Sequence, residues 1–223
     1  MTTLHKRIFA EFLGTAALLA IVVGSGIMGQ QLANGNFAVA LLANSLATGT
    51  GLFVLITILG PISGAHFNPC VTVLFWAKNE RSNIELLTYV VAQILGALLG
   101  VWIAHLMFDL PILSEGVKIR TGAGQWVSEF VATAGLLITI LLGLRSRGEA
   151  MPALVGAYIT SAYWFTASTS FANPALTLAR ALTDSFAGIR MEDAPGFIGS
   201  QLIATLVVIL AARFLASPSA PNR

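Results

Sequence analysis

The sequence predicts an all-α membrane protein with six transmembrane helices and two re-entrant half-helices, arranged as an inverted repeat. Hydrophobic residues make up 56% of the 223 residues and charged residues only 10%, against roughly 25% charged residues in a soluble domain. Six apolar runs come close to the roughly 20 residues that a spanning helix requires. Two copies of an Asn-Pro motif, at Asn68 and Asn173, lie 105 residues apart in segments too short to span.

The six spans follow uninterrupted apolar sequence. They are predicted over residues 8–28, 38–59, 86–108, 126–144, 151–168 and 195–216. We do not expect a cleavable signal, because the first run is too long for a signal-peptide core and contains Glu11. An even number of spans places both termini on the same side of the membrane.

The distribution of Lys and Arg predicts the orientation. The side of the termini holds eight of these residues and the other side holds four, which puts both termini in the cytoplasm of a protein of the inner (plasma) membrane. The eight are Lys6, Arg7, Lys78, Arg81, Arg145, Arg147, Arg213 and Arg223, and the four are Lys118, Arg120, Arg180 and Arg190. No basic cluster with interleaved aromatic residues occurs, so we expect no nucleic-acid partner.

Each Asn-Pro motif is suited to begin a helix. Asn is a favourable N-cap residue and Pro is favourable at the first helical position. The stretches 68–76 and 173–182 are about ten residues long, which favours re-entrant segments over spans. The two motifs are Asn68-Pro69-Cys70 and Asn173-Pro174-Ala175.

Three landmarks recur in the same order and indicate an internal repeat. Glu11-Phe12 matches Glu129-Phe130, the Asn of each motif follows after 57 and 44 residues, and Gln93 and Gln201 come later in each half. Three spans per half make the second copy inverted relative to the first. We therefore expect a single membrane channel domain, 1–223, built of inverted repeats 1–112 and 113–223.

Glu11 and Glu129 have two readings. An intramembrane carboxylate suggests a functional ion or proton site. The alternative is structural: the irregular chain before each Asn must be satisfied inside the membrane, and a carboxylate supplies acceptors. We favour loop support, because the two residues occupy equivalent repeat positions. Gln93 and Gln201 are expected to form interhelical hydrogen bonds, and Gly96 with Gly100 to allow close helix packing.

Two half-helix N-termini that face each other predict a channel for neutral molecules. Each N-terminus carries about +0.5 of a charge. The pair opposes cations, while the amides of Asn68 and Asn173 donate hydrogen bonds to a passing oxygen. The simpler alternative is that the two Asn residues only cap helices inside a transporter. The presence of two such motifs, both expected at mid-membrane, disfavours it.

These residues together resemble the major intrinsic protein (aquaporin) family. The similarity covers nearly the whole chain and is carried by the Glu-Phe-x-x-Thr opening of each half and by residues 63–72 and 171–175. It implies a six-helix bundle whose half-helices meet at the pore centre, a homotetramer with one pore per subunit, and passive transport of small neutral solutes in membrane lipid. It implies no enzyme activity, cofactor or metal.

The chain departs from the family at the constriction. Counting from the motifs, the resemblance implies that Thr48, Ser161, Ser170 and Leu176 form the selectivity filter, with Leu176 in place of the usual Arg. The predicted constriction is wide and apolar. It is similar to that of bacterial aquaglyceroporin-like channels associated with arsenic resistance, which implies arsenous acid or glycerol-like polyols as solutes, and water as a further one.

Arg180 is the remaining cation near the filter. One hypothesis is that its guanidinium reaches the outer vestibule and partly replaces the missing Arg. The alternative is an Arg at the helix end that pairs with Asp184. Cys70, the only cysteine, is expected to serve packing rather than metal binding. His66 is expected to fix the loop, with pH gating as the alternative.

Two rival functions stay open. An ordinary water-selective aquaporin would share the fold. A secondary transporter with broken helices would share the inverted repeat, but coupling requires ionisable groups and the spans hold few beyond Glu11 and Glu129.

Overall fold

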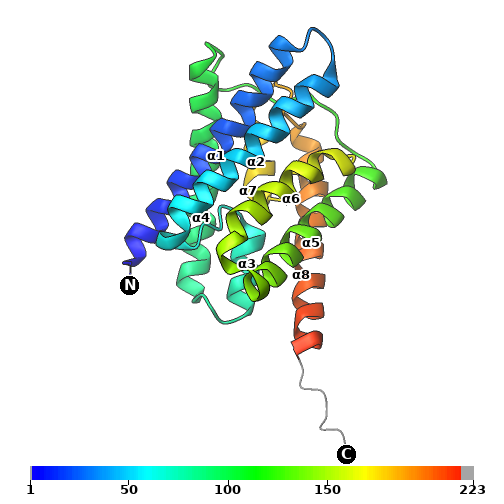
Figure 1. Cartoon of the computed structure of the whole chain (residues 1–223). Coiled ribbons are helices and arrows are strands. Elements are labelled where there is room, and N and C mark those ends of the chain that lie inside the picture. Colours follow the sequence, from blue (N-terminus) through cyan, green and yellow to red (C-terminus); the bar gives the residue numbers. More distant parts are fainter. Residues whose placement is uncertain (1, 217–223) are drawn as a thin grey trace, which may run out of the picture.

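The protein is described here by a computed structural model over residues 2–216, and this part of the chain consists of helices joined by loops (Figure 1). Met1 and residues 217–223 lie outside the described residues, and with them Arg223 and the end of the expected second repeat. The helices are α1 (Leu4–Leu32), α2 (Phe37–Ser63), α3 (Pro69–Ala77), α4 (Asn83–Met107), α5 (Ala123–Ser146), α6 (Met151–Phe165), α7 (Pro174–Arg180) and α8 (Ala194–Ala216), with single turns η1 (Gly148–Ala150) and η2 (Met191–Asp193).

The helices confirm the predicted fold class, with one span shorter than expected. Five helical stretches among the described residues are long and apolar enough to cross a membrane, namely α1, α2, α4, α5 and Met191–Phe214, which covers η2 and most of α8. Helix α6 has only 15 residues, but η1 precedes it without a break. Its predicted end at residue 168 is three residues too late, because Thr166 leaves the helix for an extended conformation.

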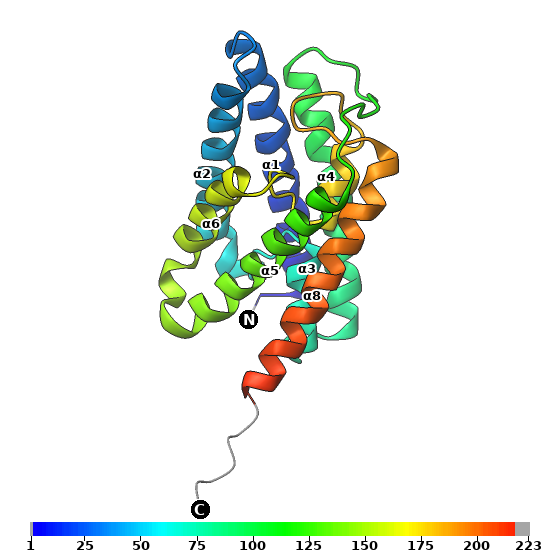
Figure 2. The same cartoon turned by 90° about the vertical axis from the view of Figure 1, so that its right-hand side faces the viewer.

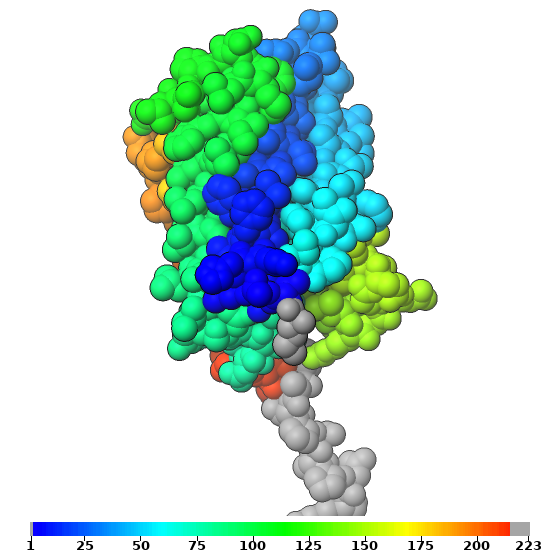
Figure 3. All heavy atoms as spheres, turned by 90° about the vertical axis from the view of Figure 1, so that its left-hand side faces the viewer, coloured from blue at the N-terminus to red at the C-terminus, as the bar shows by residue number. Residues whose placement is uncertain are grey.

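The long helices surround the two short ones. Helix α1 packs along α2 and α4, α5 packs along α6 and α8, and α2 packs against α6. In Figure 3, α1 lies at the surface between α4 and α2. Gly96 and Gly100 of α4 permit close approach to α1, because a Cβ at either position would collide with the backbone carbonyls of Phe12 and Ala16.

Each half-helix begins at its Asn, as predicted. The Asn68 side chain accepts a hydrogen bond from the Cys70 N–H (2.9 Å). The Asn173 side chain accepts from the N–H groups of Ala175 (3.0 Å) and Leu176 (3.2 Å). Helices α3 and α7 contact each other and lie among the long helices (Figures 1 and 2). The start of α1 and the end of α8 lie at the same end of the molecule (Figure 1).

Candidate pore

The Glu11 carboxylate holds the first pore loop, residues 64–68. It accepts hydrogen bonds from the backbone N–H groups of His66 (2.9 Å) and Phe67 (2.7 Å). The Ser63 hydroxyl (2.7 Å) and the Gln93 amide (2.9 Å) also donate to it. Glu11 is fully buried, so these four donors take the place of water around the carboxylate.

Glu129 does the same for the second pore loop, residues 166–173. Its carboxylate accepts from the N–H groups of Phe171 (2.9 Å) and Ala172 (2.8 Å) and from the Gln201 amide (2.6 Å). The Ser168 hydroxyl, at the position equivalent to Ser63, does not donate to this carboxylate but accepts from the Ser170 N–H (3.2 Å). Glu129 therefore binds one donor fewer than Glu11.

Both loops use the same unusual backbone conformation. Left-handed φ angles occur three residues and one residue before each Asn, at Ala65 (49°) and Phe67 (48°) and again at Ser170 (50°) and Ala172 (49°). Such a conformation costs about 1–2 kcal/mol for a residue other than glycine. The carboxylate hydrogen bonds to these loops offset that strain.

The two motifs bind each other across the middle of the protein. Asn68 donates from Nδ2 to the carbonyl of Ala172 (2.7 Å), and Asn173 donates from Nδ2 to the carbonyl of Phe67 (2.8 Å). An amide nitrogen has two N–H groups, so each Asn keeps a second donor. Both Asn residues line a cavity, so that donor can bind a molecule inside it.

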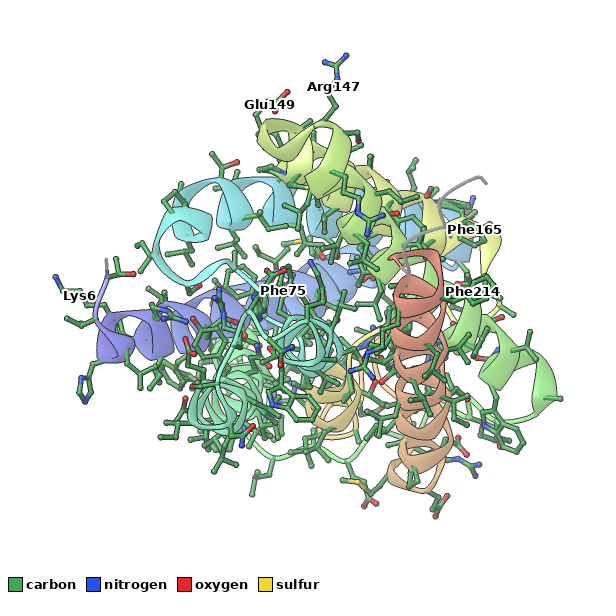
Figure 4. The ribbon with its side chains drawn as sticks, turned by 90° about the horizontal axis from the view of Figure 1, so that it is seen from below. Lys6, Phe75, Arg147, Glu149, Phe165 and Phe214 are labelled. Carbon is green, nitrogen blue, oxygen red and sulfur yellow. The ribbon has the colours of Figure 1, made fainter. Side chains whose placement is uncertain are left out.

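The cavity runs between the long helices and the two pore loops. None of the described residues that line it is Asp, Glu, Lys or Arg. Phe75 lines one end of the cavity. In the view from below, Phe75 lies near the centre of the molecule, and Lys6, Arg147 and Glu149 lie at the periphery of the molecule (Figure 4). Apolar side chains line most of its length: Leu18, Leu52, Ile56, Val71, Leu136, Ile140, Leu144, Met151, Val155 and Ile159.

Three of the four expected filter residues lie at the other end of the cavity. Thr48, Ser170 and Leu176 line it. Ser161 does not: its side chain is exposed on the outside of α6 and donates to the Tyr158 carbonyl (2.7 Å). Tyr163 lines the cavity in its place and its hydroxyl contacts the Thr48 hydroxyl (3.2 Å).

The error at Ser161 has a simple geometric reason. Consecutive residues of a helix are about 100° apart around its axis, so a shift of two residues turns a side chain from one face to the other. Counting back from Asn173 does not show where α6 gives way to the loop. The cavity is therefore lined by an aromatic residue, Tyr163, that the count did not predict.

Comparison with known proteins assigns the chain to a family. The sequence matches the family described as "Major intrinsic protein" over residues 1–167. The chain belongs to the major intrinsic protein family. It is 53% identical over 218 residues to the aquaglyceroporin AqpS of Rhizobium meliloti (strain 1021), covering 98% of this chain and 93% of that protein. It is 30% identical to the aquaporin AqpM of Methanothermobacter marburgensis, covering 97% and 100%.

A solved structure shares the fold. The X-ray structure of the aquaglyceroporin from Plasmodium falciparum matches with a TM-score of 0.74 at 20% identity, covering 98% of each chain. This member of the major intrinsic protein family is thus a multi-pass membrane channel for small neutral solutes and not an enzyme.

In this channel Arg180 is buried against the second pore loop. It is 1% exposed, its Nε donates to the Ala187 carbonyl (2.5 Å), and its Cζ lies 3.3 Å from the centroid of the Phe171 ring. The alternative in which Arg180 pairs with Asp184 is wrong, because Asp184 is exposed and no ion pair joins the two. Arg180 does not line the cavity itself, but Phe171 does.

Sequence reasoning missed Arg120, which it counted only for orientation. Arg120 lies in the loop between α4 and α5, is 5% exposed, and donates to the carbonyls of Gly188 (2.8 Å) and Ser168 (3.0 Å). Burial, reinforced by the charge of Arg180, lowers the pKa of Arg120 to about 9. It remains a cation at neutral pH. Nothing in the sequence distinguishes it from an exposed loop Arg.

The side chains of Cys70 and His66 have different surroundings. Cys70 is fully buried outside the cavity, with its Sγ 3.8 Å from the Gln201 carbonyl. His66 lines the cavity, and its Nδ1 lies 3.1 Å from the Thr72 hydroxyl. Its ring stacks on Phe75 with centroids 4.7 Å apart. These contacts hold the ring in one orientation. Across the described residues no group of three or more His, Cys, Asp and Glu is placed to hold a metal.

Proposed function

We propose that the channel conducts arsenous acid and glycerol-like polyols passively, with water as a further solute, and excludes protons and ions through the paired half-helices. The observation that supports this most directly is the cavity: it joins both pore loops, and none of the described residues that line it is Asp, Glu, Lys or Arg. A triol entering it exchanges water for hydroxyl and amide partners and leaves no ion unpaired.

The outer end of the cavity supplies partners for hydroxyl groups. The Ser170 hydroxyl is buried and has no hydrogen-bond partner in the described protein, and Thr48, Tyr163 and Leu176 lie around the same end. Leu176 adds an apolar wall where the family has Arg. This mixture favours a compact neutral polyol over an ion. We also propose that Ser170, Thr48 and Leu176 act as filter residues together with Tyr163.

The chain is proposed to be one channel domain of two inverted repeats, 1–112 and 113–223, with both termini in the cytoplasm of the inner membrane. The matched carboxylate bonds of Glu11 and Glu129 support the repeat. A homotetramer is proposed from the family resemblance. Exposed apolar side chains on α2, such as Leu46, Val54 and Ile58, would contact lipid or a neighbouring subunit.

Stopped-flow light scattering of proteoliposomes tests the function. Glycerol and arsenous acid should each enter faster than in empty vesicles, independently of any ion gradient. Leu52 lines the cavity and its neighbour Phe53 is exposed on the outside. Leu52→Trp should therefore abolish solute entry and Phe53→Trp should leave it unchanged.

The other outcomes identify the rivals. Entry of water without glycerol or arsenous acid would mean a water-selective aquaporin. Uptake that requires a proton or sodium gradient would mean a secondary transporter. Equal loss of entry in the Leu52→Trp and Phe53→Trp variants would contradict the assignment of the cavity as the path.

A further inference from the structure

Two buried guanidinium groups contact one ring of the pore wall. The Cζ atoms of Arg180 and Arg120 lie 3.3 Å and 5.0 Å from the centroid of Phe171, and Phe171 lines the cavity. A cation over an aromatic face is stabilised by the ring. The two positive charges therefore lie behind the pore wall, about one side chain away from the path of the solute.

Neither guanidinium is neutralised by a carboxylate in direct contact. Within residues 2–216, no salt bridge includes Arg120 or Arg180. Their side-chain hydrogen bonds run to uncharged acceptors, namely the carbonyls of Gly188, Ser168, Phe186 and Ala187 and the Thr169 hydroxyl. Arg180 Nη1 has no hydrogen-bond partner in the described protein. Carbonyl groups stabilise a buried cation but leave its net charge in place.

Two buried carboxylates lie near the pair and do not cancel it. Asp193 accepts from the Arg120 backbone N–H (2.8 Å), but its carboxylate is paired with the Arg190 guanidinium. Glu129 accepts from the loop N–H groups of Phe171 and Ala172. With Asp193 neutralised by Arg190, one carboxylate, Glu129, stands against two guanidinium groups and leaves an excess of one positive charge. At the opposite end of the pore, Arg7 forms an ion pair with Glu85, while the partly exposed Arg81 donates to the Ser63 carbonyl (3.3 Å).

We propose that Arg120 and Arg180 form a cation barrier behind the pore wall, and that it replaces the pore-lining Arg that Leu176 displaces. In a low-dielectric surrounding, a charge acts strongly across the thickness of one ring. Hydronium and metal cations are repelled at the outer end of the pore. A neutral polyol meets the uncharged side chains that line this end of the cavity. Arg120 is thereby a specificity-determining residue, an inference that deepens the proposed function and rests on it.

Thr169 offers a way to cancel this charge without removing either Arg. Its hydroxyl lies 3.5 Å from Arg120 Nη1, and its φ angle is 60°, a left-handed conformation that Asp and Asn tolerate. Thr169→Asp places a carboxylate beside the guanidinium. Thr169→Asn has the same shape without the charge and is the matched control.

The experiment measures two fluxes in the same proteoliposomes. Proton entry is followed with an enclosed pH dye under a valinomycin-clamped potassium potential, and glycerol entry by light scattering. We expect Thr169→Asp to raise proton conductance about tenfold over Thr169→Asn, with glycerol entry equal in both. Equal proton conductance in the two variants, with glycerol entry retained, would overturn the proposal.

A second pair covers the case in which neither Thr169 variant folds. Arg180→Lys keeps the charge and Arg180→Gln removes it, while both can still donate to the Ala187 carbonyl. Proton conductance should rise only in Arg180→Gln, and a rise in both or in neither would contradict the barrier. Failure of the wild type to pass glycerol or arsenous acid would refute the proposed function, whereas the proton comparison would still test the barrier.

Discussion

The two pore loops share their backbone support and differ in the side chains stacked behind them. In each half, the residue two before the Asn stacks on the residue seven after it. In the first half this pair is His66 and Phe75, with ring centroids 4.7 Å apart. In the second half it is Phe171 and Arg180, with the Cζ 3.3 Å from the ring centroid. The ring is kept, and its partner changes from an aromatic to a cation.

This difference separates what builds the pore from what selects the solute. Glu11 and Glu129 hold both loops in the same way, because a left-handed backbone inside a membrane requires acceptors wherever it occurs. The Arg180 guanidinium donates to the Ala187 carbonyl, which lies outside the second pore loop, so the loop backbone does not depend on this side chain. The second half is therefore free to carry charge, which gives the two ends of one pore different electrostatic character.

The largest effect is expected at the two carboxylates. Glu11→Gln leaves one acceptor for four donors, so two donors lose their partner, and Glu129→Gln leaves one acceptor for three. At roughly 2 kcal/mol per unsatisfied buried donor, Glu11→Gln should destabilise by about 4 kcal/mol and Glu129→Gln by about 2 kcal/mol. Unfolding in mixed detergent micelles, followed by tryptophan fluorescence, measures both. A greater loss in Glu129→Gln would reverse the comparison.

Helix packing should be less tolerant in the first half. Gly96 and Gly100 correspond to Ala204 and Val208, which already carry side chains. Gly96→Ala brings a Cβ against the Phe12 carbonyl and should destabilise by about 1–3 kcal/mol in the same unfolding assay.

Gly60 is the matched control for that substitution. It lies in α2 with no atom within 4 Å of an added Cβ, so Gly60→Ala should stabilise by about 0.5–1 kcal/mol. Equal effects of the two substitutions would mean that close packing of α1 on α4 does not matter.

The structure places Tyr163 at the cavity where the count along the sequence placed Ser161. Flux measurements can distinguish the two residues. Tyr163→Ala should widen the outer end and raise glycerol entry by roughly threefold. Ser161→Ala should leave glycerol entry as in the wild type, because Ser161 is on the outside of α6. Stopped-flow light scattering measures both variants. A change at Ser161 without one at Tyr163 would restore the original assignment.

The smallest effect is expected at the third motif residue. Cys70 and Ala175 occupy equivalent positions and both are buried. Cys70→Ala removes one sulfur atom and should destabilise by about 1 kcal/mol with unchanged glycerol entry. A membrane-permeant maleimide should not label the wild type until it unfolds. Rapid labelling of the folded channel would place the thiol in the pore.

Much of this architecture was predictable because a lipid environment demands apolar helices of sufficient length and satisfied backbone groups. Apolar length predicts the helices, and duplicated Asn-Pro motifs predict both half-helices, which are capped by Asn68 and Asn173. Thr48 and Leu176 were placed at the pore because they lie on a helix or directly after a motif. Tyr163 and Arg120 were not, because a loop of unknown path separates each from any landmark. Helical facing and loop packing depend on tertiary contacts that periodicity does not encode.

The crossed amide bonds from Asn68 to the Ala172 carbonyl and from Asn173 to the Phe67 carbonyl set an order of assembly during synthesis. A nascent chain that has emerged only as far as α4 can insert its first helices into the bilayer. Its first re-entrant segment still lacks the Ala172 carbonyl and the Asn173 amide, which are translated about a hundred residues later. Maturation of that segment is therefore a late, cooperative event, completed when the last third of the polypeptide leaves the translocon.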